Sequence, residues 1–180
     1  MGTRERRSRS NENDRLISQL FLASGADSRE VAIAAVGSFG RGELSPGSDL
    51  DIVILHSGSY AAAKLSEIVN SILYPLWDQK IKVDHSVRTR QEVRAALDDD
   101  LKVAMGLLDI RLICGDSDIV SDIQSMALDA WRDGADKYLP MLESTLEERY
   151  QRNGELAYLL EPDLKESRGG LRDITALRAM

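Results

Sequence analysis

The sequence has 180 residues, 43% of them hydrophobic and 29% charged, which is typical of a folded globular protein with its own core. Its formal net charge of -7 argues against a general nucleic-acid binder, because such a protein needs a basic face to neutralise phosphates. A small basic cleft for one nucleotide is compatible with that charge. The single cysteine excludes an intramolecular disulfide, and the sequence has no apolar run of signal-peptide or membrane-spanning length. We therefore expect a cytoplasmic protein that binds neither nucleic acid nor membrane.

The first half of the chain contains two apolar runs after a polar beginning. Residues 1–13 are polar and rich in arginine, which predicts a disordered basic arm. Asp14 is a candidate cap for a helix that carries apolar residues at helical spacing. The runs VAIAAVG over 31–37 and LDIVIL over 50–55 are continuously apolar and rich in β-branched residues. They indicate two buried strands.

The next segments differ from these runs in their period. Residues 61–77 place apolar side chains three and four positions apart, which predicts an amphipathic helix. Residues 81–88, IKVDHSVR, alternate between apolar and polar, which predicts a strand with one face open to a polar space. Thr89 and Glu92 form a capping-box pattern that begins another helix.

From about residue 100 onward the pattern is helical. We interpret residues 101–115 as a helix with Gly115 as its C-cap, and helical patterns follow over 118–133 and 136–152. Proline and paired glycines interrupt the pattern over 161–174. The last residues stop inside a new helical pattern, so we expect a piece of a longer protein.

Two aspartates lie one residue apart where the second strand begins. Residues i and i+2 of a strand point to the same side with α-carbons roughly 6–7 Å apart, so Asp49 and Asp51 should project together. Carboxylates this close repel each other, and divalent cations between them relieve the repulsion. Such ions clamp phosphates for in-line nucleotidyl transfer, and oxygen ligands suit Mg²⁺ or Mn²⁺. Asp84, on the polar side of its strand, is the candidate third ligand and proton acceptor.

The glycine-containing segment before the aspartates supplies candidate contacts to a nucleotide. A strand that ends at Gly37 exposes backbone N–H groups and leaves room for phosphate oxygens. Ser38 adds a hydroxyl donor. Arg41 can pair with a phosphate or simply with Glu43, and Ser48 is a further candidate contact.

Each of these features also has an ordinary structural explanation. Gly-Ser turns and the stretch SPGSD occur in many proteins, and Asp49 alone is more often a turn residue than a ligand. The combination of an apolar strand, Gly-Ser, a ten-residue spacer, Asp-Leu-Asp and a second apolar strand is rarer and favours a functional site. Cys114 lies among apolar residues, which predicts a buried and inert thiol.

The stretch VGSFGRGELSPGSDLDIVIL resembles the active-site signature of the DNA polymerase β-like nucleotidyltransferase superfamily, with Gly-Ser, a spacer and Asp-x-Asp between apolar residues. Three further stretches are similar to the PII uridylyltransferase family: DHSVRT at 84–89, LKVAMGLLDIRLICGD at 101–116 and DLKESRGGLRDI at 163–174. Together the matches span about residues 31–174, most of the chain.

This resemblance implies transfer of UMP, or in some bacteria AMP, from UTP or ATP to a tyrosine of the nitrogen-regulatory protein PII. It implies release of pyrophosphate and Mg²⁺ or Mn²⁺ as cofactor. Asp49 and Asp51 would be catalytic metal ligands, and Gly37 and Ser38 the phosphate-binding turn. Some members have glycine where this sequence has Asp84, so the third ligand depends on the strand alternation. Full-length members continue into a helical region, an HD phosphohydrolase domain and two ACT domains that sense glutamine.

We therefore expect a mixed α/β fold: a polymerase-β-like core with a small, largely antiparallel or mixed sheet and helices on one face. The core would span residues 14–115, and a helical extension would span 116–180. Two main alternatives remain open, besides the remote one of a scaffold that binds no ligand. The chain could perform the same chemistry on a small molecule or another protein, or it could be a nucleotide-binding fragment that is inactive because groups beyond residue 180 complete the site.

Overall fold

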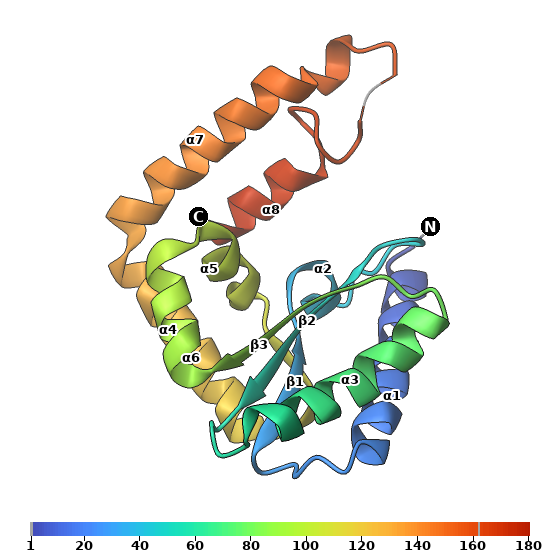
Figure 1. The fold of residues 1–180 in the computed structure, drawn as a ribbon. Coiled ribbons are helices and arrows are strands. Elements are labelled where there is room, and N and C mark those ends of the chain that lie inside the picture. Colours follow the sequence, from blue (N-terminus) through green and yellow to red (C-terminus); the bar gives the residue numbers. More distant parts are fainter. Residues whose placement is uncertain (1, 162) are drawn as a thin grey trace. The chain divides into compact units, whose positions relative to one another are not determined.

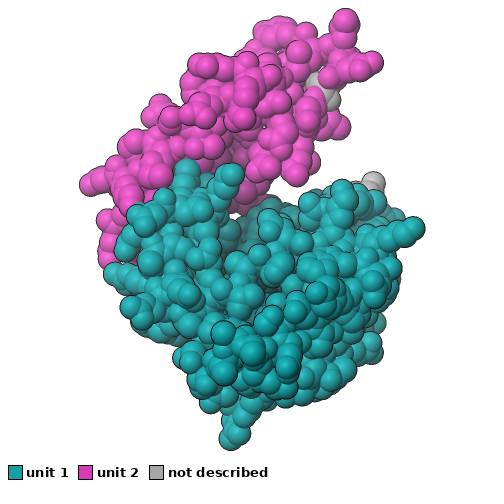
Figure 2. All heavy atoms as spheres, viewed as in Figure 1, with its two compact units in different colours: residues 1–128 teal, residues 129–180 magenta. Residues whose placement is uncertain are grey.

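The computed structural model describes residues 2–161 and 163–180, and the chain divides into two compact units, residues 1–128 and residues 129–180 (Figure 2). Unit 1 contains the sheet and unit 2 is helical. The division falls after Leu128, whereas the sequence places it near residue 115. The difference arises because the helix that begins at Ser117 contributes buried side chains, among them Val120 and Ile123, to unit 1.

The sheet of unit 1 has four strands in the order β3-β2-β1-β4 and is mixed, as the sequence predicts (Figure 1). Strand β1 (Val31–Ala35) pairs antiparallel with β2 (Leu50–His56) on one side and with β4 (Arg111–Gly115) on the other. Strand β3 (Val83–Thr89) pairs parallel with β2. A parallel pair needs a crossover connection, and the helix between these two strands provides it.

Helices cover both faces of the sheet, so the expectation of helices on one face is wrong. On one face, Ile33 and Ile52 share a core with residues of α1 and α3, including Ile72. On the opposite face, Ala32 and Leu55 are equally buried, and Figure 1 shows α4, α5 and α6 on that side. Continuously apolar strands are buried on both faces for this reason. The helices are α1 (Thr3–Ala23), α2 (Gly37–Gly40), α3 (Ala62–Asp78), α4 (Arg90–Asp99), α5 (Leu101–Leu108) and α6 (Ser117–Asp133).

Helix α1 begins at Thr3, within the segment for which the sequence predicts a disordered arm. That prediction is wrong for residues 3–13. A carboxylate oxygen of Glu5 accepts a hydrogen bond from the Gly2 amide at 3.1 Å, and arginine and glutamate are good helix formers. Asp14 consequently lies within the helix and does not cap it.

Residues 101–115 form a helix and a strand, and the prediction of one helix there is wrong. Helix α5 ends at Leu108, and β4 begins at Arg111. Gly115 has φ +91°, and a Cβ on it would lie 2.1 Å from the backbone oxygen of Val31. The glycine therefore permits the close approach of β4 to β1 and is not a helix cap. The continuous apolar run gave no period that separates the two elements.

Unit 2 is held together by aromatic stacking and a buried ion pair. Trp131 stacks on Tyr138 with ring centroids 4.9 Å apart, and its indole N–H donates to the Ala179 carbonyl at 2.7 Å. Arg149, only 6% exposed, pairs with Asp173 and so ties α7 to α8. The elements of this unit after α6 are α7 (Ala135–Asn153), the short 3-10 helix η1 (Leu156–Tyr158) and α8 (Leu171–Ala179). Among the described residues of the whole chain, no helix has the length and apolarity that a membrane crossing requires.

Candidate active site

Two of the three candidate carboxylates lie directly opposite each other on neighbouring strands. Asp51 of β2 is the register partner of Asp84 of β3. Side chains at paired positions of adjacent strands point to the same face, and such strands are about 4.8 Å apart. Asp51 is half-buried and Asp84 is exposed. The pair therefore lies at the N-terminal ends of both strands, with Asp84 accessible to a ligand.

The glycine bend lies against the first of these carboxylates. Gly37 has φ +57°, and a Cβ on it would lie 3.2 Å from Oδ2 of Asp51. The neighbouring Val36 amide donates to the Asp51 carbonyl at 3.0 Å, which fixes the bend to β2. Ser38 follows within the single turn of α2. The structure therefore brings the candidate phosphate turn and a candidate catalytic carboxylate together.

The two remaining candidates from this loop precede β2. Ser48 and Asp49 are exposed, and the Ser48 amide donates to the Ser45 carbonyl at 3.1 Å. The next residue, Leu50, donates from its amide to the Lys82 carbonyl at 2.9 Å. Asp49 therefore lies at the edge of the sheet where β2 and β3 begin, the same edge that carries Asp84.

The donor set fits a hard divalent cation in its chemistry, although it is not preassembled. Among residues 2–161 and 163–180, no group of three histidine, cysteine, aspartate or glutamate side chains is arranged to hold a metal ion. Asp51 and Asp84 nevertheless offer carboxylate oxygens from adjacent strands, and Asp49 offers a third from the same edge. Binding a cation would require these side chains to rotate toward one another.

Arg41, a candidate nucleotide contact, is engaged by acidic side chains. Its Nε donates to Oε2 of Glu43 at 2.9 Å, and Nη1 pairs with Asp109. Burial lowers the pKa of Arg41, but the hydrogen bond to Glu43 and the charge of Asp109 outweigh burial and raise the pKa overall. A phosphate contact would have to use other donors of the guanidinium or replace these partners. The structure shows the pairing with Glu43 that the sequence also allows.

Strand β4 adds an arginine to this region that sequence reasoning missed. Arg111 donates from Nε to the Gly40 carbonyl at 3.0 Å and from Nη2 to the Phe39 carbonyl at 3.2 Å. It was missed because β4 itself was not predicted and because about 70 residues separate it from the turn that it contacts. The only available signal was its position in the stretch DIRLICGD, which resembles the family but assigns no contact.

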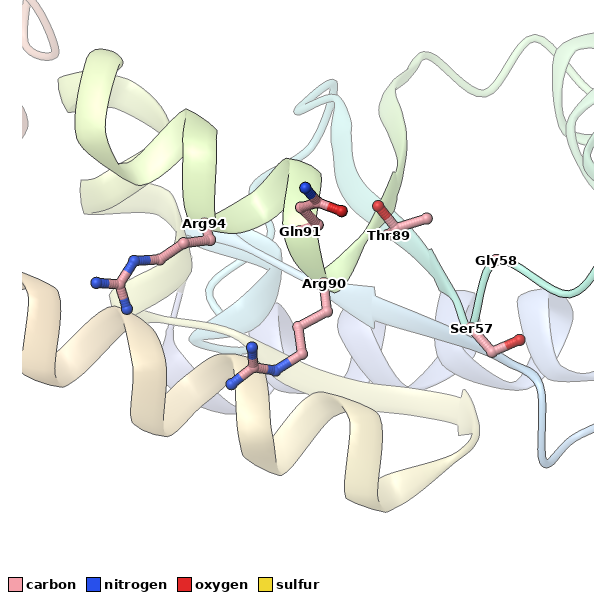
Figure 3. A pocket seen from close by; sticks show the side chains of 6 residues that line it. All are labelled: Ser57, Gly58, Thr89, Arg90, Gln91 and Arg94. Atoms are coloured by element: carbon pink, nitrogen blue, oxygen red, sulfur yellow. The ribbon is translucent and has the colours of Figure 1, made fainter.

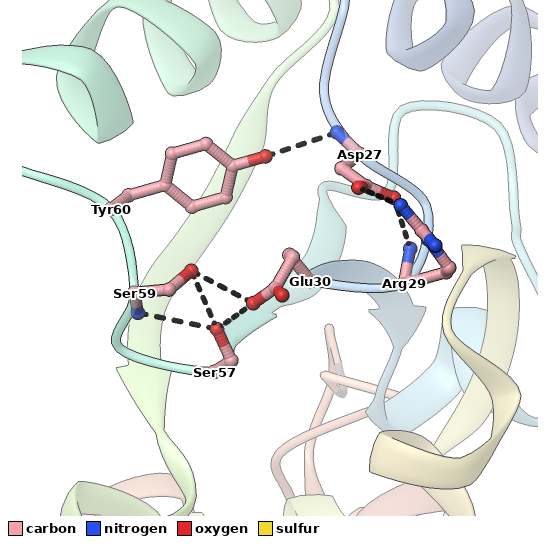
Figure 4. A network of polar contacts seen from close by, with 6 residues as sticks. All are labelled: Asp27, Arg29, Glu30, Ser57, Ser59 and Tyr60. Carbon is pink, nitrogen blue, oxygen red and sulfur yellow. Dashed lines mark hydrogen bonds and ion pairs between the residues drawn. The ribbon is translucent and has the colours of Figure 1, made fainter.

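A pocket of about 560 Å³ lies at the opposite ends of β2 and β3, and none of the candidate site residues lines it (Figure 3). Its lining residues include Arg90, which pairs with Asp122, and Thr89, whose hydroxyl accepts from the Glu92 amide. Nearby, hydrogen bonds from the hydroxyls of Ser57 and Ser59 lower the pKa of Glu30 and join the loop after β2 to the start of β1 (Figure 4). These groups already satisfy one another and form a structural network.

Comparison with known proteins identifies related sequences. The family model for a nucleotidyltransferase domain matches residues 19–104, which include the bend and all three carboxylates. The model named GlnD PII-uridylyltransferase matches residues 141–180. A bifunctional uridylyltransferase/uridylyl-removing enzyme of Streptomyces coelicolor is 46% identical over 179 residues, 99% of this chain and 21% of that protein. The chain belongs to the PII-uridylyltransferase family of nucleotidyltransferases.

Other members of this family show the same pattern of coverage. The protein of the same name from Mycobacterium tuberculosis is 41% identical over 86% of this chain and 19% of its own length. The chain thus spans about a fifth of the length of the curated relatives that it matches. Among solved structures, a toxin–antitoxin complex with AMP-PNP aligns with a TM-score of 0.48 and 14% identity, over 74% of this chain and 98% of that chain.

Proposed function

We propose that this chain transfers UMP, or alternatively AMP, from the nucleoside triphosphate to a tyrosine of the signalling protein PII. The observation that supports it most directly is the position of Asp51, which lies between the Gly37 bend and Asp84 inside a matched nucleotidyltransferase domain. The match to the PII-uridylyltransferase model favours PII as the acceptor, and the uridylyltransferase relatives at 34–46% identity favour UTP as the donor. A cytoplasmic location accompanies this proposal because both substrates would be found there.

In this mechanism, the turn at Gly37 and Ser38 binds the triphosphate, since a glycine leaves room for phosphate oxygens beside exposed amides. Asp49, Asp51 and Asp84 would hold Mg²⁺ or Mn²⁺, which when bound neutralises phosphate charge and lowers the pKa of an attacking hydroxyl. Asp84 is exposed and can accept the proton of the acceptor tyrosine. The tyrosine oxygen bonds to the α-phosphorus while the bond to the bridging oxygen breaks, and pyrophosphate leaves.

The net charge of the chain also bears on the acceptor. At -7, it favours a protein or small-molecule acceptor over a nucleic acid, because polyanions are repelled by an acidic protein. The two candidate donors, UTP and ATP, differ in the base. Both triphosphates present the same phosphates and metal requirement to the residues named above.

Intact-mass analysis of PII after incubation with the chain, Mg²⁺ and either UTP or ATP tests the proposal directly. The expected result is a mass increase of one nucleotidyl group per PII subunit, with the mass identifying the base. Matched controls are an Asp51→Asn variant and a PII whose acceptor tyrosine is replaced by phenylalanine. Unmodified PII together with a labelled alternative acceptor would show that the substrate assignment is wrong. Triphosphate binding without any transfer would favour a nucleotide-binding fragment.

A further inference from the structure

The C-terminal end of the α2 turn is capped by a side chain from a distant strand. Arg111 of β4 donates to the carbonyls of Phe39 and Gly40 at 3.2 and 3.0 Å, and its guanidinium lies 5.5 Å from the centre of the Phe39 ring. The last carbonyls of a helix have no partner within the helix. The Phe39 carbonyl also accepts from the Gly42 amide at 3.0 Å, so Arg111 adds a second bond there and a bond to the Gly40 carbonyl. Arg111 is thereby hydrogen-bonded to the turn at the end opposite Gly37.

Arg111 is in turn oriented by an acidic residue of α1. Its Nη1 and Nη2 bond the two carboxylate oxygens of Asp14 at 2.9 and 3.1 Å. The side chains are 36% and 21% exposed, so solvent screens the pair only partly. A two-pronged contact of this kind fixes the plane of the guanidinium as well as its position. The pairing with Asp14 therefore fixes the direction of the Arg111 N–H groups that donate to the Phe39 and Gly40 carbonyls.

The turn between these contacts has little room to move. A Cβ on Gly40 would lie 2.0 Å from the backbone oxygen of Asp109, so the turn packs directly on the connection between α5 and β4. At its other end the Val36 amide is bonded to Asp51. Any shift of the turn would change the contact of Gly37 with the Asp51 carboxylate.

We infer that Asp14 and Arg111 form a positioning pair that holds the Gly37–Gly40 turn in register with Asp51 for binding of the triphosphate. This inference rests on the proposed function of the turn. Both residues act through the backbone of the turn, to which Arg111 is bonded at Phe39 and Gly40. Lysine at position 111 keeps the charge but lacks the planar fork, and it cannot bond Asp14 doubly while also bonding both carbonyls.

The test compares Arg111→Met, Arg111→Lys and Asp14→Asn with a matched control, Arg90→Met. Arg90 also pairs with an aspartate, but it is exposed and lies at the opposite end of the strands. The measurements are the Kd for UTP and for ATP with Mg²⁺, the KM and kcat of transfer, thermal unfolding, and amide hydrogen exchange over residues 37–42.

Arg111→Met is expected to weaken affinity of the folded protein for its triphosphate by about tenfold, because small misplacements of a binding element carry costs of this order. Amide exchange over residues 37–42 should rise, and KM should change more than kcat. Arg111→Lys should lie between wild type and Arg111→Met, and Arg90→Met should match wild type. Adding Asp14→Asn to Arg111→Met should cause no further loss, because coupled residues are not additive.

A lower melting temperature with unchanged Kd and unchanged exchange over 37–42 would show that Arg111 is merely structural and would overturn the inference. Failure of the proposed function has a different signature. If wild-type protein binds triphosphate but leaves PII unmodified, the transfer proposal fails while the Kd and exchange comparisons still decide the role of Arg111. A wild-type protein that binds neither triphosphate would overturn both.

Discussion

Replacing Gly37 by alanine tests the contact on which the candidate site depends. Gly37 has φ +57°, where an L-residue is disfavoured by about 1 kcal/mol, which lowers the melting temperature of a chain of this size by about 2–4 °C. The added Cβ would also lie 3.2 Å from Oδ2 of Asp51, which is closer than the ordinary contact range that begins at 3.4 Å. The carboxylate must therefore yield by a few tenths of an ångström.

The two effects can be separated with a second glycine of the same loop. Gly42 has φ +69°, and a Cβ on it would meet nothing within 4 Å. Gly42→Ala should therefore cost the same backbone strain, about 1 kcal/mol, without disturbing Asp51. We expect both variants to lose similar stability in urea unfolding.

Only Gly37→Ala should lose activity. A displacement of a catalytic group by about 1 Å lowers the reaction rate roughly a hundredfold, so a displacement of a few tenths of an ångström should lower it by about tenfold. The assay is the initial rate of nucleotidyl transfer at saturating triphosphate, corrected for the folded fraction. Equal rates for Gly37→Ala and Gly42→Ala would refute the reasoning, since the contact with Asp51 would then have no functional consequence.

Three further outcomes are expected. Mg²⁺ with UTP should raise the melting temperature of the wild-type protein, and Asp51→Asn and Asp84→Asn should lose this rise because the stabilisation requires binding. An unchanged rise in both variants would contradict the candidate site. Gly115→Ala should lower the free energy of unfolding by about 3 kcal/mol or more, because its Cβ would lie 2.1 Å from a backbone oxygen of β1. Gly25→Ala, also at positive φ but in open space, is its control in urea denaturation, and equal losses would contradict the steric explanation. Burial raises the pKa of the Cys114 thiol to about 11. Alkylation of Cys114 at pH 8 should therefore be about a hundredfold slower than alkylation of a free thiol, and it should accelerate as the pH rises. Rapid labelling at pH 8 would contradict this expectation.

The central part of the fold could be predicted because its period was unambiguous. Residues 61–77 and 81–88 have clear helical and alternating patterns, and the structure places α3 and β3 there. The capping box of Thr89 and Glu92 is also formed, with hydrogen bonds in both directions. In these segments the local pattern and the tertiary contacts favour the same structure.

Predictions failed where tertiary contacts overrode a local signal. The glycine at 115 resembles a helix cap in sequence, but its role is to admit the backbone of β1, which lies about 80 residues earlier. The arginine-rich start suggests disorder from its charge, yet Ser10 is buried and α1 is continuous through it. The charge content of a segment indicates how well it is solvated. It does not indicate which face of a helix packs against the rest of the protein.

The residues of the candidate site could be predicted, but the contacts that place them beside one another could not. Alternation placed Asp84 on a polar face, but its pairing with Asp51 depends on the parallel register of two strands, which no local pattern encodes. The pairing of Arg111 with Asp14 joins residues 97 apart in the chain. Contacts of this range follow from the complete topology, so reasoning from single segments could not supply them.

The parallel alignment of β2 and β3 means that the candidate site is assembled only when both strands have folded. The chain must pass through α3 before β3 can align with β2, so a polypeptide that ends before residue 84 lacks half of the acidic pair. A shift of β3 by one residue would turn Asp84 toward the core and expose Val83 and Val87, which normally pack there. Apolar side chains on one face of β3 thus select the placement of the carboxylate on the other. A misaligned chain would retain its helices and strands by circular dichroism while losing the proposed cation site.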